Sequence, residues 1–340
     1  MRGHGANGTM VEILSHRQKT RRQAEKTNIN LQYPEKRVYS TTNKHKNLDD
    51  LKEGTMKRKL AVLLSLIIVL FFSASAFAET TLEKINRTGV LTIGTRTALT
   101  GFAFINDKKE WVGFSIDLVE QAIAPVISKK LGKAIKVEKK ESTPPTRIPL
   151  VTSNAVDLIA ETMTDTRSRR ESVDFSLTYF VTGAQFLVKK DSPIKGVQDI
   201  EGKRIAALKG STSARIIREK YMGAQLLEFP DQPAAFQALT QGQVDAYTND
   251  GTYLAGLIKK APNPDDWVIA GAFYTYEPYG MAMRKNESDF RTLVNNALME
   301  AIESGKYFEL YEKWFGPNGE VPYPLTSENK RFLILQVVPK

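Results

Sequence analysis

The sequence contains one structural pattern twice: a helix, a short loop and a buried strand that ends in polar residues. Leu150 is followed by Val156-Asp157-Leu158, and Leu239 is followed by Val244-Asp245-Ala246, with spacings that differ by one residue. In α/β sheets, ligands bind beyond the carboxyl ends of the strands. The repeat therefore predicts two α/β units that each carry polar groups at the carboxyl edge of a sheet.

The segment after the first of these strands, residues 162–176, combines hydroxyls with arginines. Its sequence, TMTDTRSRRESVDFS, places threonines directly before an arginine cluster. A guanidinium is a planar two-pronged donor, and hydroxyls fill the remaining lone pairs of a carboxylate. The segment therefore predicts a carboxylate site, and the alternative is a solvated basic turn.

Composition excludes several kinds of site from the part of the chain after residue 78. The sequence has no cysteine, and its three histidines are His4, His16 and His45. Residues 79–340 therefore cannot form a Cys/His nucleophilic site, a Ser-His-Asp triad or an ordinary zinc site. We expect neither a metal nor another cofactor. The formal charge of +10 comes mainly from the part before residue 79, so it does not argue for nucleic-acid binding.

The N-terminus predicts a disordered polar leader over residues 1–55 and a secretory signal peptide over residues 56–78. The signal has a basic start, an apolar stretch at residues 60–72 and an Ala-Phe-Ala cleavage sequence. Because such signals stand at the start of a chain, we predict that translation begins at Met56. Cleavage after Ala78, with no cysteine at that point, predicts a soluble periplasmic protein.

Periodicity places two arginines beside element ends in the first half of the body. Residues 90–95 alternate as a strand, and Arg96 follows directly. Residues 114–131 have a helical apolar stripe in which Pro125 predicts a kink. Arg147 begins a short helix after a proline-rich loop. Without further information, both arginines could equally be solvated.

The second half repeats the arrangement with different polar groups. Residues 203–208 are a predicted strand, and the turn Gly210-Ser211-Thr212-Ser213 then opens a helix at residues 214–222. Free amides at a helix start favour an anion, although a plain N-cap is the alternative. The strand at residues 244–248 leads to Asp250, which is either a ligand for a cation or part of an Asx turn.

Taken in order, these motifs resemble the family 3 periplasmic solute-binding proteins, the amino-acid receptors of ABC importers, and within them the glutamate/aspartate-binding branch. The resemblance runs from about Leu82 to about Phe332. Besides residues 162–176, it rests on Thr146-Arg147-Ile148-Pro149-Leu150, Gly210-Ser211-Thr212-Ser213, Leu254-Ala255-Gly256, Asp265-Asp266-Trp267 and Tyr279-Gly280 leading to Met283-Arg284-Lys285. The order and spacing of these motifs carry the resemblance, rather than any one of them.

The resemblance implies an α/β fold of the type II periplasmic binding protein class, with two mixed-sheet lobes joined by a two-segment hinge. Lobe 1 would comprise residues 79–182 and 279–340, and lobe 2 residues 183–278. The ligand would lie between the lobes, and the closed protein would dock on the membrane permease of an ABC transporter. We expect a monomer.

The resemblance also implies the residues that contact the ligand. Arg169 matches the arginine that clamps the α-carboxylate, and Asp250 matches the carboxylate that binds the α-ammonium. Arg96 and Arg147 match arginines of the acidic branch, where the second of these contacts the distal carboxylate. The predicted ligand-binding residues are Arg96, Arg147, Thr162, Thr164, Arg169, Thr212, Gln232 and Asp250.

Two positions depart from the pattern of the glutamate/aspartate-binding branch, and two further arginines match no ligand-contacting position. Pro144 stands where the branch has a serine, and Gln232 stands where it uses a histidine. Arg167 and Arg170 match no ligand-contacting position, and we expect them to be solvated. The departures put the identity of the ligand in doubt, but not its class.

Charge predicts the class of ligand. Arg96, Arg147 and Arg169 carry +3 and Asp250 carries −1, so a zwitterionic ligand would leave two arginines unpaired. Leaving a buried charge without its partner costs about 3–5 kcal/mol. We therefore predict glutamate or aspartate, and the alternative is a neutral polar amino acid such as glutamine.

Two other functional classes use the same fold. A periplasmic dehydratase of the prephenate/arogenate type would need a proton donor in the cleft, for which Glu161 is the candidate. We predict instead that Glu161 is a structural carboxylate at a strand end. A sensor domain would need a following transmembrane helix or effector domain, which we do not expect. We therefore predict a binding protein and not an enzyme.

Overall fold

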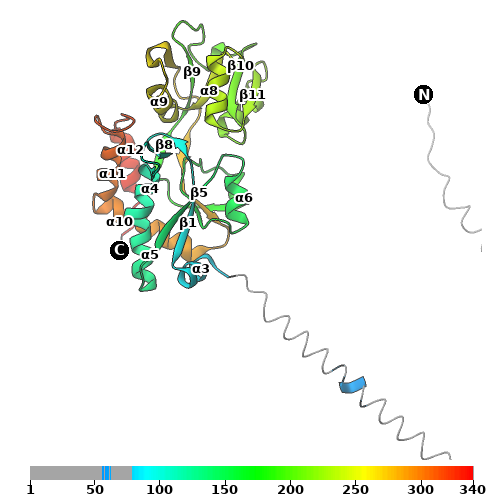
Figure 1. Cartoon of the computed structure of the whole chain (residues 1–340), viewed down its shortest axis with the longest axis vertical. Helices are drawn as coiled ribbons and strands as arrows, with labels where there is room; N and C mark the ends of the chain where they lie inside the picture. The colour runs from blue at the N-terminus through cyan, green and yellow to red at the C-terminus, as the bar shows by residue number, and fades with distance from the viewer. Residues whose placement is uncertain (1–55, 57, 61, 63–78, 340) are drawn as a thin grey trace, which may run out of the picture. The chain divides into compact units, whose positions relative to one another are not determined.

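The computed structural model describes residues 56, 58–60, 62 and 79–339. The predicted leader and most of the predicted signal peptide, including its cleavage site, lie outside the described residues. Residues Ala78–Lys340 form one compact unit. Within it, Figure 1 shows two α/β parts, one around β1 and β5 and the other around β9, β10 and β11.

The first sheet has five strands in the order β5-β1-β6-β15-β7. Strand β1 runs parallel to β5 and β6, whereas β15 runs antiparallel to both β6 and β7. The strands are β1 (Val90–Thr95), β5 (Lys136–Glu141), β6 (Leu158–Ile159), β7 (Val173–Phe175) and β15 (Ala282–Arg284). The chain therefore leaves this sheet after β7 and returns to it at β15.

Helices from both ends of the body accompany the first sheet. They are α3 (Thr81–Thr88), α4 (Phe114–Leu118), α5 (Ala124–Leu131), α6 (Arg147–Thr152), α10 (Ser288–Glu303), α11 (Lys306–Phe315) and α12 (Ser327–Leu335). The predicted helix over residues 114–131 is interrupted, because a π-helical turn at Val119–Ile123 separates α4 from α5. Such turns and prolines are the usual causes of a bend, and Pro125 lies in the first turn of α5.

The second sheet has the order β11-β10-β12-β9-β13. Its central strands β10 and β12 are parallel, and β9 runs antiparallel to β12. The strands are β9 (Ala184–Lys189), β10 (Arg204–Leu208), β11 (Gln225–Phe229), β12 (Ala246–Asp250) and β13 (Trp267–Ala270). The accompanying helices are α7 (Thr212–Lys220), α8 (Gln232–Thr240) and α9 (Gly251–Lys259).

The sequence repeat has the same structural role in both sheets. The amide of Asp157 donates to the carbonyl of Thr92 at 2.8 Å, and the amide of Thr92 donates back to the Asp157 carboxylate at 2.8 Å. Asp245 makes the same pair of bonds with Arg204, also at 2.8 Å. Each aspartate thus bonds the start of a central strand to the neighbouring parallel strand. These bonds fix the register of the two strands and therefore the relative position of their ends.

Two short strands connect the sheets. Strand β8 (Phe180–Thr182) precedes the second sheet, and β14 (Glu277–Tyr279) follows it. They pair antiparallel, with Thr182 opposite Glu277. A second small sheet contains β2 (Ala98–Leu99), β3 (Ala103–Ile105) and β4 (Trp111–Val112). The antiparallel pair places Glu277 between the two sheets.

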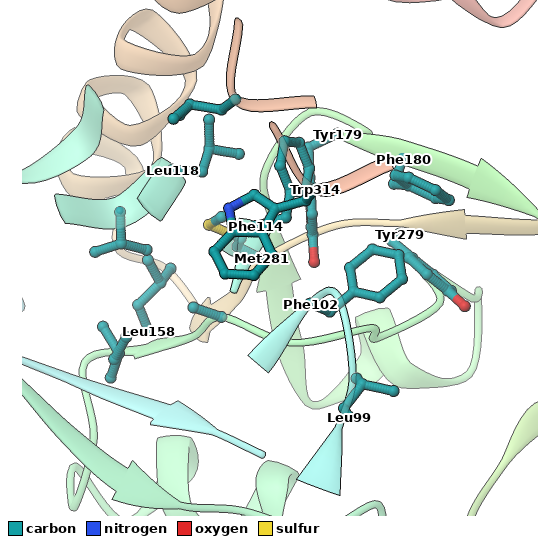
Figure 2. Packing of buried hydrophobic residues seen from close by; sticks show 14 of the residues in the cluster. Leu99, Phe102, Phe114, Leu118, Leu158, Tyr179, Phe180, Tyr279, Met281 and Trp314 are labelled. Carbon is teal, nitrogen blue, oxygen red and sulfur yellow. The ribbon is translucent and has the colours of Figure 1, made fainter. Parts of the chain in front are cut away.

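Aromatic side chains fill the core beside the first sheet. The Phe114 ring packs edge-to-face on Tyr307 at a centroid distance of 5.5 Å and on Phe315 at 5.4 Å. Figure 2 shows Phe114 among Tyr179, Met281 and other buried side chains. Helix α11 contributes to this core, since its Tyr307 and Phe315 are fully buried.

Candidate functional site

A small cavity lies where the carboxyl ends of strands from both sheets meet. Its volume is about 20 Å³, which is room for about one water molecule. The lining residues are Arg96, Pro144, Arg147, Thr162, Thr164, Leu208, Ser211, Thr212, Ser213, Asn249, Asp250 and Tyr253. The structure therefore brings six of the eight predicted ligand-binding residues to one place, and the exceptions are Arg169 and Gln232.

Strand ends explain why distant residues meet in this cavity. Arg96 directly follows β1, and Thr162 follows the neighbouring parallel strand β6. Thr212 begins α7 after β10, and Asp250 ends the neighbouring parallel strand β12. Parallel strands deliver their carboxyl ends to the same edge of a sheet, which is where α/β proteins bind ligands.

Glu161 lies between the two arginines on the first-sheet side. Its side chain is fully buried, with Oε2 at 3.7 Å from Nε of Arg96 and Oε1 at 3.6 Å from Nη1 of Arg147. These distances are ion-pair contacts and are too long for hydrogen bonds. Arg96 also donates from Nη2 to the hydroxyl of Tyr253 in α9 at 3.1 Å, which links the two sheets.

The position of Glu161 changes the charge balance on which the acidic ligand was predicted. Arg96 and Arg147 are both buried, but neither lacks an anionic neighbour, since Glu161 contacts both. Glu277 adds another buried carboxylate. Together with Arg169 and Asp250, the site holds three arginines and three carboxylates, so the premise of two unpaired arginines is wrong.

Arg169 connects the two sides of the site without lining the cavity. Its Nη1 donates to the carbonyl of Thr164 at 2.7 Å, and its Nη2 donates to the carbonyl of Gly210 at 3.0 Å. Burial, and then the charge of Arg147, lowers the pKa of Arg169 to about 9. The guanidinium is therefore still charged at neutral pH. Arg167 and Arg170 are exposed, as predicted.

Asp250 is buried at the end of β12 and accepts a hydrogen bond from the hydroxyl of Tyr279. Burial, followed by the nearby charge of Glu277, raises the pKa of Asp250 to about 8. The carboxyl group is therefore mostly protonated at neutral pH. A cation placed beside Asp250 would favour its ionised form and would lower this pKa again.

Glu277 is a site residue that the sequence interpretation missed. Its Oε2 accepts hydrogen bonds from the hydroxyl of Thr164 and, at 2.7 Å, from the hydroxyl of Thr212. These hydroxyls come from opposite sides of the site. Glu277 lies near the end of predicted lobe 2, and both threonines are distant from it in the sequence, so no local sequence pattern marked it.

Gln232 and Thr162 differ in their position relative to the cavity. Gln232 is buried in the first turn of α8, does not line the cavity, and its Oε1 has no hydrogen-bond partner. Thr162 lines the cavity, and its carbonyl accepts from Nη1 of Arg147 at 3.3 Å. Contacts of all eight predicted residues with a ligand stay a prediction.

Comparison with known proteins identifies the family. The profile of the bacterial extracellular solute-binding proteins, family 3, matches residues 91–317. The chain belongs to this family. An L-glutamate/L-aspartate-binding protein of Pseudomonas aeruginosa is 32% identical over 287 residues, covering 80% of this chain and 95% of that protein.

Two further proteins are similar to this family 3 protein, one a relative in sequence and one a solved structure. A glutamine-binding protein of Geobacillus stearothermophilus is 40% identical over 219 residues, covering 64% of this chain and 80% of that protein. The solved structure of AncCDT-1, an ancestral amino acid-binding protein and precursor of cyclohexadienyl dehydratase, is 33% identical with a TM-score of 0.61. It covers 69% of this chain and 100% of that chain.

These matches confirm the predicted resemblance and fold class. The protein is an amino-acid solute-binding protein of family 3, and it has the two-lobed mixed α/β fold of the periplasmic amino-acid-binding proteins. The matched relatives are binding proteins. Because these relatives are named for different amino acids, the family does not determine the ligand of this chain.

Proposed function

We propose that this protein is the substrate-binding component of an amino-acid ABC importer. It would reach the periplasm after cleavage of the signal peptide behind Ala78, bind its ligand between the two sheets, and deliver it to the membrane permease. The observation that supports this function is the cavity at the carboxyl edges of both sheets, where Asp250 lies near the start of α7 and where Arg169 bonds to the carbonyl of the lining residue Thr164. The predicted lobes, residues 79–182 with 279–340 and residues 183–278, are part of the proposal.

The cavity supports a binding cycle with an opening step. An amino acid is larger than about 20 Å³, so the sheets must move apart to admit it. The contacts that close the site on both sides, Arg169 to Gly210 and Arg96 to Tyr253, would break in that step. A ligand that contacts both sides would then stabilise the closed arrangement.

The charged groups support an amino acid whose side chain ends in hydrogen-bond acceptors. Arg169 would hold the α-carboxylate and Asp250 the α-ammonium. Arg96 and Arg147, which line the cavity from the first-sheet side, would face the end of the side chain. A guanidinium donates and never accepts, so the complementary group is a carboxylate or a carboxamide.

Two kinds of ligand remain, acidic amino acids and glutamine, and each has an observation in its favour. Glutamate and aspartate are favoured by the arginines at the cavity and by the Pseudomonas relative. Glutamine is favoured by the two additional buried carboxylates, Glu161 and Glu277, and by the Geobacillus relative. Glutamate and aspartate are the ligands predicted from the sequence, and glutamine is the stated alternative.

The first experiment is a thermal-shift screen of the purified protein after unfolding and refolding to remove carried-over ligand. The screen would contain the twenty amino acids and small dicarboxylates. A ligand at 100 times its dissociation constant should stabilise the protein by about 2.7 kcal/mol. A shift with glutamate, aspartate or glutamine supports the proposal. Shifts confined to apolar or basic amino acids, or no shift at all, would contradict it.

An enzyme on the same fold is the competing proposal, and the surroundings of Glu161 argue against it. A proton donor must reach the reacting group, but Glu161 does not line the cavity and instead faces two guanidinium groups. Incubation with prephenate, followed by an assay for the dehydrated product, tests the enzyme directly. Conversion of prephenate by the protein would show that it is an enzyme and would contradict the proposed binding function.

A further inference from the structure

Glu161 is an unusual buried carboxylate because its charge is contacted only at ion-pair distance. Its side chain is fully buried, and neither carboxylate oxygen has a hydrogen-bond partner among the residues that the structure describes. A buried charged group without hydrogen bonds costs several kcal/mol in desolvation unless its neighbours compensate. The compensating neighbours here are the guanidinium groups of Arg96 and Arg147.

The backbone holds Glu161 firmly in this position. Its carbonyl accepts from the amide of Met163 at 2.8 Å and from the hydroxyl of Tyr179 at 2.8 Å. The preceding residue, Ala160, is also fixed, because its carbonyl accepts from the hydroxyl of Thr95 at 2.9 Å. The carboxylate therefore projects from a rigid strand end, between the residue that follows β1 and the residue that begins α6.

The two arginines separate Glu161 from the cavity. Arg96 and Arg147 line the cavity, whereas Glu161 does not. A ligand would contact the guanidinium groups directly, and the negative charge of Glu161 would act on it only by partly neutralising those groups. Part of the donor capacity of the arginines is still free, since Nε of Arg147 has no hydrogen-bond partner.

Charge counting then separates the two candidate ligands. Once the α-ammonium of a bound ligand has ionised Asp250, the three arginines and three carboxylates of the site sum to zero, and a bound glutamine keeps this sum at zero. A bound glutamate makes it −1. If the charge of Glu161 is removed, the site alone carries +1, and glutamate restores neutrality. In a buried site, an unbalanced charge weakens binding strongly.

We propose that Glu161 is a specificity-determining residue, which acts through Arg96 and Arg147 to make the site prefer a neutral carboxamide side chain over a carboxylate. Glu161 is thus a positioning and charge-setting residue and does not contact the ligand. This inference rests on the proposed function. It assigns glutamine rather than glutamate as the preferred ligand of the natural protein.

The test is calorimetric titration of the protein and of Glu161→Gln with L-glutamine and L-glutamate at pH 7. We expect the natural protein to bind glutamine more tightly. In Glu161→Gln, the ratio of the two dissociation constants should shift toward glutamate by about tenfold or more. A purely structural role would weaken both ligands equally and would leave this ratio unchanged.

Matched variants make the result specific to this charge. Glu161→Asp keeps the charge and should keep the preference for glutamine. Asp165→Asn removes a carboxylate four residues away, which pairs with the exposed Arg170 instead, and should not change the ratio. If Glu161→Gln does not fold, the double variant with Arg147→Met restores the charge balance and should again prefer glutamine to glutamate.

The outcomes separate this inference from the proposed function. If the natural protein binds none of glutamine, glutamate and aspartate, the proposed function fails. If it binds an amino acid but prefers glutamate, or if the ratio is the same in Glu161→Gln as in the natural protein, only the role of Glu161 is overturned. A shift of the ratio in Asp165→Asn equal to that in Glu161→Gln would also overturn it.

Discussion

Ligand binding should release a proton from Asp250. Burial and the neighbouring Glu277 raise the pKa of Asp250 to about 8, so at pH 7 about nine-tenths of the molecules carry a proton on this group. An α-ammonium beside Asp250 favours the ionised carboxylate. Binding at pH 7 should therefore release up to about 0.9 proton per ligand, and each pH unit below 8 should weaken the affinity by about tenfold.

Calorimetry in two buffers of different ionisation enthalpy measures this proton directly. The observed binding enthalpy should differ between phosphate and Tris at pH 7 by an amount that corresponds to proton release. The effect should diminish toward pH 8.5, where Asp250 is largely ionised before the ligand arrives. Zero proton exchange at pH 7, or proton uptake, would refute the assignment of the ammonium to Asp250.

The same group predicts the pH dependence of stability without ligand. Its folded pKa is raised, so the stabilisation by protonated Asp250 is present below its ordinary pKa of 3.8 and is lost as the pH rises through about 8. The difference corresponds to on the order of 5 kcal/mol at 1.36 kcal/mol per pH unit. Urea unfolding at pH 5, 7 and 9 should show this loss, and Asp250→Asn should remove most of it. The same slope in Asp250→Asn as in the natural protein would mean that other groups cause it.

Three further substitutions test the site and the fold. Arg147→Met should weaken glutamate by more than tenfold and glutamine by less, since the lost guanidinium compensates a carboxylate best; equal losses in titration would contradict this. Gly183→Ala should destabilise the protein by about 1–3 kcal/mol in urea, because a Cβ there would lie 2.5 Å from Cβ of Phe273 and 2.6 Å from the carbonyl of Thr275. Phe114→Ala should cost about 3–5 kcal/mol by the same measurement, and a loss below 1 kcal/mol would mean that the aromatic cluster repacks.

Local patterns were enough to predict the elements that carry the site. The strand at residues 90–95 is β1 in full, and Arg147 begins α6 as predicted. The structure differs from the predicted elements where the periodicity of side chains does not determine the backbone conformation. The apolar stripe of residues 114–131 is continuous, but the backbone winds once as a π-helix before Pro125, and no residue pattern marks that change.

The site residues that could be predicted from the sequence are polar residues that follow or end a predicted strand. This holds for Arg96, Thr162 and Asp250, which the structure brings to one cavity. The roles of Glu161 and Glu277 were not predictable, because their partners are distant in sequence and come from several elements. A charge count taken from the arginines alone therefore omitted the buried carboxylates that face them.

A threonine hydroxyl has one proton and can donate one hydrogen bond. In this structure, the hydroxyl protons of Thr164 and Thr212 both go to the same oxygen of Glu277. A ligand carboxylate that accepts from these hydroxyls must displace Glu277. Each new hydrogen bond to the ligand then replaces one to Glu277, so the two bonds add little net affinity. For such a ligand, Glu277 would be an internal competitor, and the carboxylate that joins the two sides of the site would also limit the affinity.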